Sequence, residues 1–210
     1  MNEIVKPKII GGIHYDEKYI KVSGKDYYDL NAIDNKTKFV LAHSFVGKRT
    51  KEECIKFLKQ IKDSCFEQII ERYNQEKYKK VKDRELIEFT CDGFENYKSA
   101  FMKLFYRICK LNFGVPIACK KYGLKHNNNA IERYNGKIKD RIKNIRSGFK
   151  NFDDAKCFMD LRRTIHNFVN PNQELNGKTP AEMAEINLNL GRNKLLGLIK
   201  FVRDNCITLI

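Results

Sequence analysis

The 210-residue sequence contains no apolar run that approaches the roughly 20 residues needed to cross a membrane. Its first residues show no long apolar segment followed by small residues, so no secretory signal is expected. Both absences predict a protein of the cytoplasm with no membrane partner. Hydrophobic residues make up 42% and charged residues 32% of the chain, which excludes a disordered polymer and indicates one large domain with a sizeable core.

The seven cysteines lack the paired spacing of a metal or redox motif. They are odd in number, widely spread and mostly flanked by apolar residues, and none forms a C-x-x-C pair. We therefore expect neither a disulfide framework nor a zinc ribbon, and we interpret the cysteines as reduced core residues.

Acidic residues are scarce relative to basic ones. The chain has 41 Lys and Arg against 26 Asp and Glu, a formal net charge of +15. The imbalance is greatest in residues 106–210, which hold 20 basic and 9 acidic side chains. A surface this basic predicts a polyanionic partner, and nucleic acid is the partner that it favours.

The pattern of turns and apolar residues predicts a mixed α/β protein. Three extended segments separated by short polar turns indicate an antiparallel meander over residues 13–46. Thr50 with Glu53 has the spacing of a capping box, so a helix should begin near residue 51. Further on we expect strands at 85–91 and 115–119, a helix around 97–105, helices at 127–146 and 153–169, and a short helix from Pro180. This order predicts the ribonuclease H-like fold, a five-stranded mixed sheet flanked by helices.

Three carboxylates occupy positions that converge in such a fold. Asp16 lies inside the first strand, Asp92 follows the fourth, and Glu132 lies near the start of a helix. Carboxylate oxygens suit Mg²⁺ or Mn²⁺, and two such ions can stabilise the attacking and leaving oxygens of a phosphoryl transfer.

Each carboxylate also has a plainer interpretation. Glu17 could be the ligand in place of its neighbour Asp16, and Asp92 could only make an Asx turn before a glycine. Glu132 could be an acid favoured by the dipole in the first turn of its helix.

The helix predicted over residues 127–146 has two distinct faces. Its apolar face should pack on the core, and it consists of Ile131, Tyr134, Ile138, Ile142 and Ile145. A second face holds Glu132 and Gly136 beside a row of cations, Lys139, Lys143 and Arg146. The spacing thus predicts one carboxylate at the head of a row that holds substrate phosphates.

Four segments carry a resemblance to a known family: HYDEKYIKVSGKDYYDLNAID, FTCDGFENY, GLKHNNNAIERYNGKIKDRIKNIRSGF and HNFVNPNQELNGKTPAEMA. Together they resemble the catalytic core of insertion-sequence DDE transposases of the retroviral integrase superfamily. The resemblance covers about residues 13–185. It leaves residues 1–12 as a short lead without a recognisable DNA-binding domain, and residues 186–210 as a C-terminal tail.

The resemblance implies that Asp16, Asp92 and Glu132 bind two Mg²⁺ ions, for which Mn²⁺ can substitute. The implied activity is DNA nicking at an element's end followed by attack of the freed 3′ hydroxyl on target DNA. The implied partners are transposon ends, target DNA and further copies of the chain bridged by DNA, at the nucleoid of a prokaryote. The residues then expected to contact DNA are Asn128, Asn129, Arg133, Lys137, Lys139, Lys143 and Arg146.

Two other functions fit the same residues. The chain could be a catalytically silent DNA-binding relic or regulator derived from a transposase, since family members normally carry an end-recognition domain before the core. It could also be a nuclease of the same fold. Of the histidines, His14 and His126 lie near the expected site, whereas His43 and His166 are interpreted as packing residues.

Overall fold

The computed structural model describes residues 6–115, 128–145 and 148–207. One five-stranded sheet has the order β3-β2-β1-β4-β5. Its central strand β1 pairs antiparallel with β2 and parallel with β4. The sheet is therefore mixed, as the sequence predicted. The strands are β1 (Ile13–Val22), β2 (Lys25–Asp34), β3 (Val40–Val46), β4 (Glu88–Thr90) and β5 (Lys110–Asn112).

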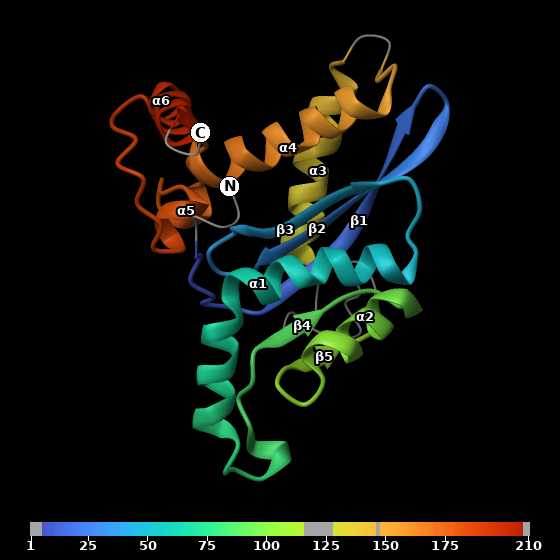
Figure 1. The fold of residues 1–210 in the computed structure, drawn as a ribbon, viewed down its shortest axis with the longest axis vertical. Helices are drawn as coiled ribbons and strands as arrows, with labels where there is room; N and C mark the ends of the chain where they lie inside the picture. The colour runs from blue at the N-terminus through green and yellow to red at the C-terminus, as the bar shows by residue number, and fades with distance from the viewer. Residues whose placement is uncertain (1–5, 116–127, 146–147, 208–210) are drawn as a thin grey trace.

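Helices cover both faces of the sheet (Figure 1). The core around β1, α1 and α2 includes Tyr15, Phe57 and Phe89. A second core lies between the opposite face and α3 and α4, and it includes Ile131 and Met159. The helices are α1 (Lys51–Glu76), α2 (Glu95–Phe105), α3 (Asn129–Lys143), α4 (Phe152–Phe168), α5 (Pro180–Met183) and α6 (Lys194–Ile207), with 3-10 turns η1 (Val81–Asp83) and η4 (Gln173–Leu175).

The meander β1-β2-β3 depends on its two turns. Ser23 and Gly24 both have positive φ, of 48° and 79°, which gives the tight two-residue turn that matches the twist of a hairpin. In the second turn the buried Asp34 carboxylate accepts hydrogen bonds from the backbone N–H groups of Lys36 and Thr37, at 2.7 and 2.8 Å. Both turns are where the sequence predicted them.

The apolar face predicted for α3 is confirmed. Ile131, Tyr134 and Ile138 are buried, and Ile142 and Ile145 pack against the same core. On α4, the helical spacing of Ala155, Leu161 and Phe168 predicts a core-facing side. Ala155 and Phe168 are buried, whereas Leu161 is 51% exposed. The prediction was therefore wrong at Leu161 alone among these three positions; the buried residues of α4 are Ala155, Met159, His166, Asn167 and Phe168.

The fifth strand that the structure describes lies at a segment for which the sequence predicted no strand. The apolar run 115–119 suggested a strand, but Val115 is not in one, and residues 116–119 lie outside the described residues. The strand lies at Lys110–Asn112, where the backbone pairs in parallel with β4. Pairing with an existing edge decides the position of so short a strand more than its apolarity does.

The start of α1 keeps only half of the predicted capping box. The Thr50 hydroxyl accepts a hydrogen bond from the Glu53 backbone N–H, but the Glu53 side chain pairs with Lys56 instead of returning to Thr50. The complete capping box is at Thr179 and Glu182, which begin α5. This second start was predicted correctly.

The charged segment 66–85 continues α1 and then closes it. Glu76, at the end of α1, is 5% exposed. Its carboxylate accepts hydrogen bonds from the Glu85 backbone N–H at 2.9 Å and from Lys79 Nζ at 2.8 Å. The cysteines that the structure describes are free thiols. None of the described helices is both long and apolar enough to span a membrane.

Candidate active site

The parallel pairing of β1 with β4 brings Asp16 and Asp92 together. Ile13 lies opposite Phe89 and His14 opposite Thr90, so the same register continued beyond β4 places Asp92 beside Asp16. Carboxylate oxygens of Asp16, Glu17 and Asp92 all lie within 4.8 Å of one another. Two residues separated by most of the N-terminal half of the chain thus meet at one end of the sheet.

Helix α3 adds the third expected carboxylate to this region. Asn135 Nδ2, one turn after Glu132, donates a hydrogen bond to Asp16 Oδ2 at 3.4 Å. Glu132 Oε1 is buried and has no hydrogen-bond partner. Asn135 was not among the residues predicted from the sequence, although its spacing from Glu132 places both on one side of the helix.

The electrostatics of the cluster show that these carboxylates repel one another. Burial raises the pKa of Asp16 to about 7, and the neighbouring charges of Glu17, Asp92 and Glu132 add to the effect. Mutual repulsion of buried carboxylates favours a proton or a cation at the site.

Glu17 belongs to the same group but its charge is compensated. It forms an ion pair with Arg49 and accepts a hydrogen bond from the Tyr97 hydroxyl at 2.8 Å. The Arg49 guanidinium in turn lies 4.3 Å from the centre of the Phe94 ring and 4.8 Å from that of Tyr28. Burial raises the pKa of Glu17, whereas the bond from Tyr97 and the charge of Arg49 lower it in part. No local spacing in the sequence predicts these contacts between residues that are far apart in the chain.

Asp92 makes the Asx turn that was its plainer interpretation. Its Oδ1 accepts a hydrogen bond from the Phe94 backbone N–H at 3.1 Å. This bond uses one oxygen and fixes the side chain at the start of α2, within reach of the other carboxylates. The turn and the acidic cluster are therefore compatible.

His14 links the start of α3 to the sheet. Its ring lies between Asn128 Oδ1, at 3.2 Å from Nδ1, and Asn35 Nδ2, at 3.1 Å from Nε2, which fits a neutral ring with the proton on Nδ1. Burial lowers the pKa of His14, in agreement with that neutral form. Asn128 is 1% exposed, and its contact with DNA remains a prediction. His126 lies outside the described residues.

The other expected DNA contacts lie on α3, with Asn129 at its first position. Arg133, Lys137, Lys139 and Lys143 are exposed, and Arg146 is outside the described residues. Arg133 pairs with Glu174, which also binds Lys38 at 3.2 Å. Helical geometry places Lys139 and Lys143 within about 20° of Glu132 around the axis, on the side of the acidic cluster.

The donor set fits a hard divalent cation. Asp16 lies on β1, Asp92 follows β4 and Glu132 lies on a helix packed on β1, so the three carboxylates come from separate elements. The group whose oxygens lie within 4.8 Å of one another is Asp16, Glu17 and Asp92, and Glu132 is outside it. Mg²⁺ and Mn²⁺ prefer such ligands. A cation would relieve the repulsion that raises the pKa of Asp16 and would give the unpaired Glu132 oxygen a partner.

Comparison with known proteins supports the same interpretation. The family model DDE_Tnp_IS240, described as a DDE domain, matches residues 11–171. Among curated proteins, no sequence matches significantly.

Solved structures show the likeness of fold. A chain of the simian T-cell lymphotropic virus intasome, in complex with PP2A regulatory subunit B56 gamma, is 14% identical with a TM-score of 0.50. The match covers 87% of this chain and 59% of that one. The BIV integrase catalytic core domain is also 14% identical with a TM-score of 0.50, over 82% and 92% of the two chains. The HTLV-2 integrase core in complex with magnesium is 16% identical, with a TM-score of 0.48 over 83% and 95%. The predicted ribonuclease H-like fold is confirmed.

Proposed function

The chain belongs to the DDE domain family of the IS240 transposases, and on that basis we propose that it is the catalytic core of an insertion-sequence transposase. The proposed reactions are metal-dependent DNA cleavage and strand transfer. Residues 13–185 form the proposed core, with residues 1–12 as a lead and 186–210 as a tail that contains α6.

The observation that carries this proposal is a set of neighbouring carboxylates that no cation of the described residues neutralises. Asp16, Asp92 and Glu132 come from three separate elements, and their repulsion helps to raise the pKa of Asp16. Keeping like charges together in a buried place costs folding free energy. A bound divalent cation would offset that cost, and the carboxylates would serve as its ligands.

Asp16, Asp92 and Glu132 are the proposed metal ligands. When bound, two divalent cations supply Lewis-acid stabilisation to the attacking and leaving oxygens of the phosphodiester. Asn135 holds the Asp16 carboxylate toward α3. Arg49 and Tyr97 hold Glu17 on the opposite side of β1, so Glu17 acts as a positioning residue. Since both reactions are phosphoester exchanges, the protein supplies no nucleophile.

DNA is the proposed substrate because of the charge beside the carboxylates. Lys139 and Lys143 extend from Glu132 along the exposed side of α3, and the whole chain carries +15. Cations in this position hold backbone phosphates without reading sequence. The proposed assembly is a homo-oligomer bridged by two transposon ends and target DNA, acting at the nucleoid.

The test is strand resolution of a branched DNA that mimics a strand-transfer product. The purified protein is incubated with this DNA in Mg²⁺, in Mn²⁺ or in EDTA, beside Asp92→Asn and Glu132→Gln. Asp140→Asn is the matched control because it removes an exposed carboxylate from the same helix as Glu132. We expect metal-dependent rejoining in the wild type and the control, and none in the two site variants.

Other outcomes assign other functions. Cleavage without rejoining would indicate a nuclease of this fold. DNA binding without any chemistry, at every metal tested, would indicate the silent relic or regulator.

A further inference from the structure

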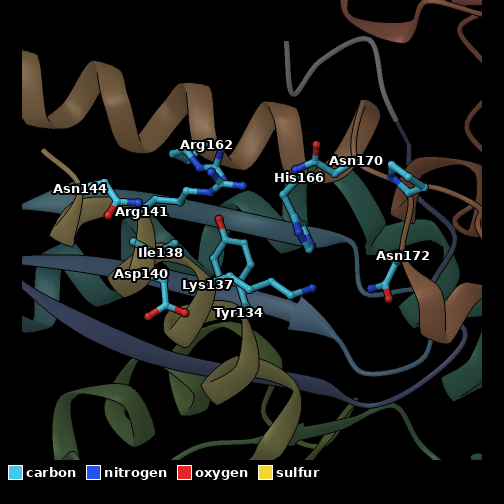
Figure 2. A pocket seen from close by; sticks show the side chains of 11 residues that line it. Tyr134, Lys137, Ile138, Asp140, Arg141, Asn144, Arg162, His166, Asn170 and Asn172 are labelled. Carbon is cyan, nitrogen blue, oxygen red and sulfur yellow. The ribbon is translucent and has the colours of Figure 1, made fainter.

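A second charged site lies between α3 and α4 (Figure 2), and none of the carboxylates of the acidic cluster lines it. A pocket of about 510 Å³ opens there. Arg141, which lines it, is nine positions after Glu132 and therefore half a turn around α3 from that carboxylate. The residues that define its chemistry are Tyr134, Lys137, Arg141, Arg162 and His166.

The cations of this pocket have no counter-ion within the described residues. No described aspartate or glutamate lies within ion-pair distance of Lys137, Arg141 or Arg162, and Arg162 Nε is buried without a hydrogen-bond partner. Asp140 also lines the pocket, but it is exposed and lies 3.9 Å from Lys143. Burial and the charge of Arg141 lower the pKa of Arg162, so the two guanidiniums repel each other.

Tyr134 contributes an unused hydroxyl at the same place. The side chain is 4% exposed, and its oxygen has no hydrogen-bond partner. Its ring packs edge-on against His166, with ring centres 4.8 Å apart. Figure 2 shows the hydroxyl directed toward Arg141 and Arg162. An unpaired buried hydroxyl destabilises the fold, and a ligand oxygen would give it the missing partner.

The carboxylate beneath the pocket does not neutralise it. Asp29 lies near enough to raise the pKa of Tyr134, although burial is the larger cause. Its own oxygens are already engaged, one with His43 Nε2 at 2.5 Å and the other with Asn31 Nδ2 at 2.7 Å. The pocket therefore offers donors and positive charge.

We propose that the pocket between α3 and α4 binds a phosphate group, held by the guanidiniums of Arg141 and Arg162 and the hydroxyl of Tyr134. Guanidinium groups match the oxygens of phosphate in geometry and charge. The phosphate belongs either to a DNA backbone or to a free phosphate ester. The site shares no ligand with the acidic cluster, so the proposal does not depend on strand transfer.

The test is calorimetric titration with inorganic phosphate in EDTA at constant ionic strength. Tyr134→Phe and Arg162→Gln remove one donor group each. Lys59→Gln is the control because it removes one exposed positive charge from α1, on the other side of the sheet. We expect the Kd for phosphate to rise at least about tenfold in both pocket variants and to stay within about twofold in the control, since a charge-assisted hydrogen bond is worth roughly 1.5–3 kcal/mol.

Tyr134→Phe also separates binding from folding. It removes an oxygen that has no partner, so its unfolding midpoint should equal or exceed that of the wild type. The proposal is overturned if wild-type protein binds no phosphate, or if the pocket variants bind it as tightly as Lys59→Gln does.

A second arm identifies the source of the phosphate. The affinity of each protein for a labelled DNA duplex is measured in EDTA, where no metal-dependent reaction contributes. A selective loss of duplex affinity in Tyr134→Phe and Arg162→Gln supports the pocket as a DNA backbone contact. Unchanged duplex affinity with lost phosphate binding supports it as a site for a free phosphate ester.

Discussion

Two buried aspartates, Asp29 and Asp16, lie on the same face of the sheet on adjacent strands, but their surroundings carry opposite charge. Asp29 on β2 contacts His43 at 2.5 Å, and His43 contacts Asp160 at 3.1 Å on its other nitrogen. Burial lowers the pKa of His43, but the two carboxylates outweigh it and raise the pKa overall. Asp16 on β1 instead faces other carboxylates, and its own pKa is raised to about 7.

The difference distinguishes charge that is neutralised within the fold from charge that a bound ligand would neutralise. The Asp29 network contains its own cation, so it stabilises the packing of α4 on the sheet. Asp16, Asp92 and Glu132 have no ion-pair partner among the described cations, since Arg49 pairs with Glu17. The pocket of Arg141 and Arg162 also contains like charges that repel one another, but these charges are positive. Like charges without a counter-ion among the described residues are the feature that both proposed sites share.

The largest expected effect is a difference in unfolding free energy between variants of the two aspartates. Asp29→Asn should lower the unfolding free energy by about 3–5 kcal/mol, because it leaves a buried imidazolium with a weaker partner. Asp16→Asn should keep or raise the unfolding free energy of the metal-free protein, since it removes a repelled carboxylate. Urea denaturation in EDTA measures both.

Activity on branched DNA should show the opposite ranking. Asp16→Asn should abolish rejoining, and any folded fraction of Asp29→Asn should retain it. The comparison fails if Asp16→Asn is the more destabilised of the two variants in EDTA.

The second prediction concerns the cation itself. Mg²⁺ or Mn²⁺ at about 100 times its Kd should stabilise the wild type by about 2.7 kcal/mol, because it binds the folded chain only. Glu132→Gln should lose most of this stabilisation, and Asp140→Asn should keep it. Thermal unfolding across a metal titration gives the result, and an equal shift in Glu132→Gln would exclude Glu132 from the ligands.

The third prediction uses a buried group that is kept neutral. Burial lowers the pKa of His166 to about 4, and its Nε2 donates to the Lys38 carbonyl at 2.8 Å. Because the unfolded chain takes up a proton near pH 6.5 and the folded chain does not, stability should fall as pH drops from 6.5 toward 4. At pH 5 the loss is about 2 kcal/mol.

His166→Asn keeps a donor for the carbonyl and removes the titration. Its unfolding free energy should therefore decline less than that of the wild type between pH 7 and pH 5, as measured by urea denaturation at each pH. Equal declines in the two proteins would show that His166 does not contribute.

The smallest expected effect distinguishes Glu17, a positioning residue, from the proposed metal ligand Asp16. Glu17→Gln should reduce strand resolution by roughly tenfold, as expected for a residue that orients ligands from outside their shell. The reason is that Gln retains the contact with Tyr97 but loses the charge that holds Arg49. Single-turnover rates measure it, with Asp16→Asn in parallel. A loss as complete as that of Asp16→Asn would instead make Glu17 a metal ligand.

Local spacing was sufficient for much of the fold. The Ser23-Gly24 turn, the start of α5 at Thr179 and the core face of α3 were all predicted correctly, because each depends on residues within a few positions of one another. The same holds for the position of Asp92 directly after β4. The resemblance to the transposase motifs then indicated that Asp92 belongs to the same site as Asp16 and Glu132.

Prediction failed where a partner outside the segment decided the outcome. A strand that the sequence analysis had not placed formed at Lys110–Asn112, where β4 offered an edge for parallel pairing. The capping box at Thr50 failed for a local reason instead, because the Glu53 side chain paired with Lys56 one turn further along α1. Helix α6 was assigned only to a tail, yet Leu198 packs into the main core.

The sequence by itself determined the net charge, the order of the elements and the three carboxylates, because composition and short-range periodicity encode them. Only the tertiary structure decided which charges are compensated. Arg49 reaches Glu17 from 32 positions away, and Asp160 reaches His43 from 117. No local pattern specifies such pairs, since they form only when the packing of helices on the sheet brings distant side chains into contact.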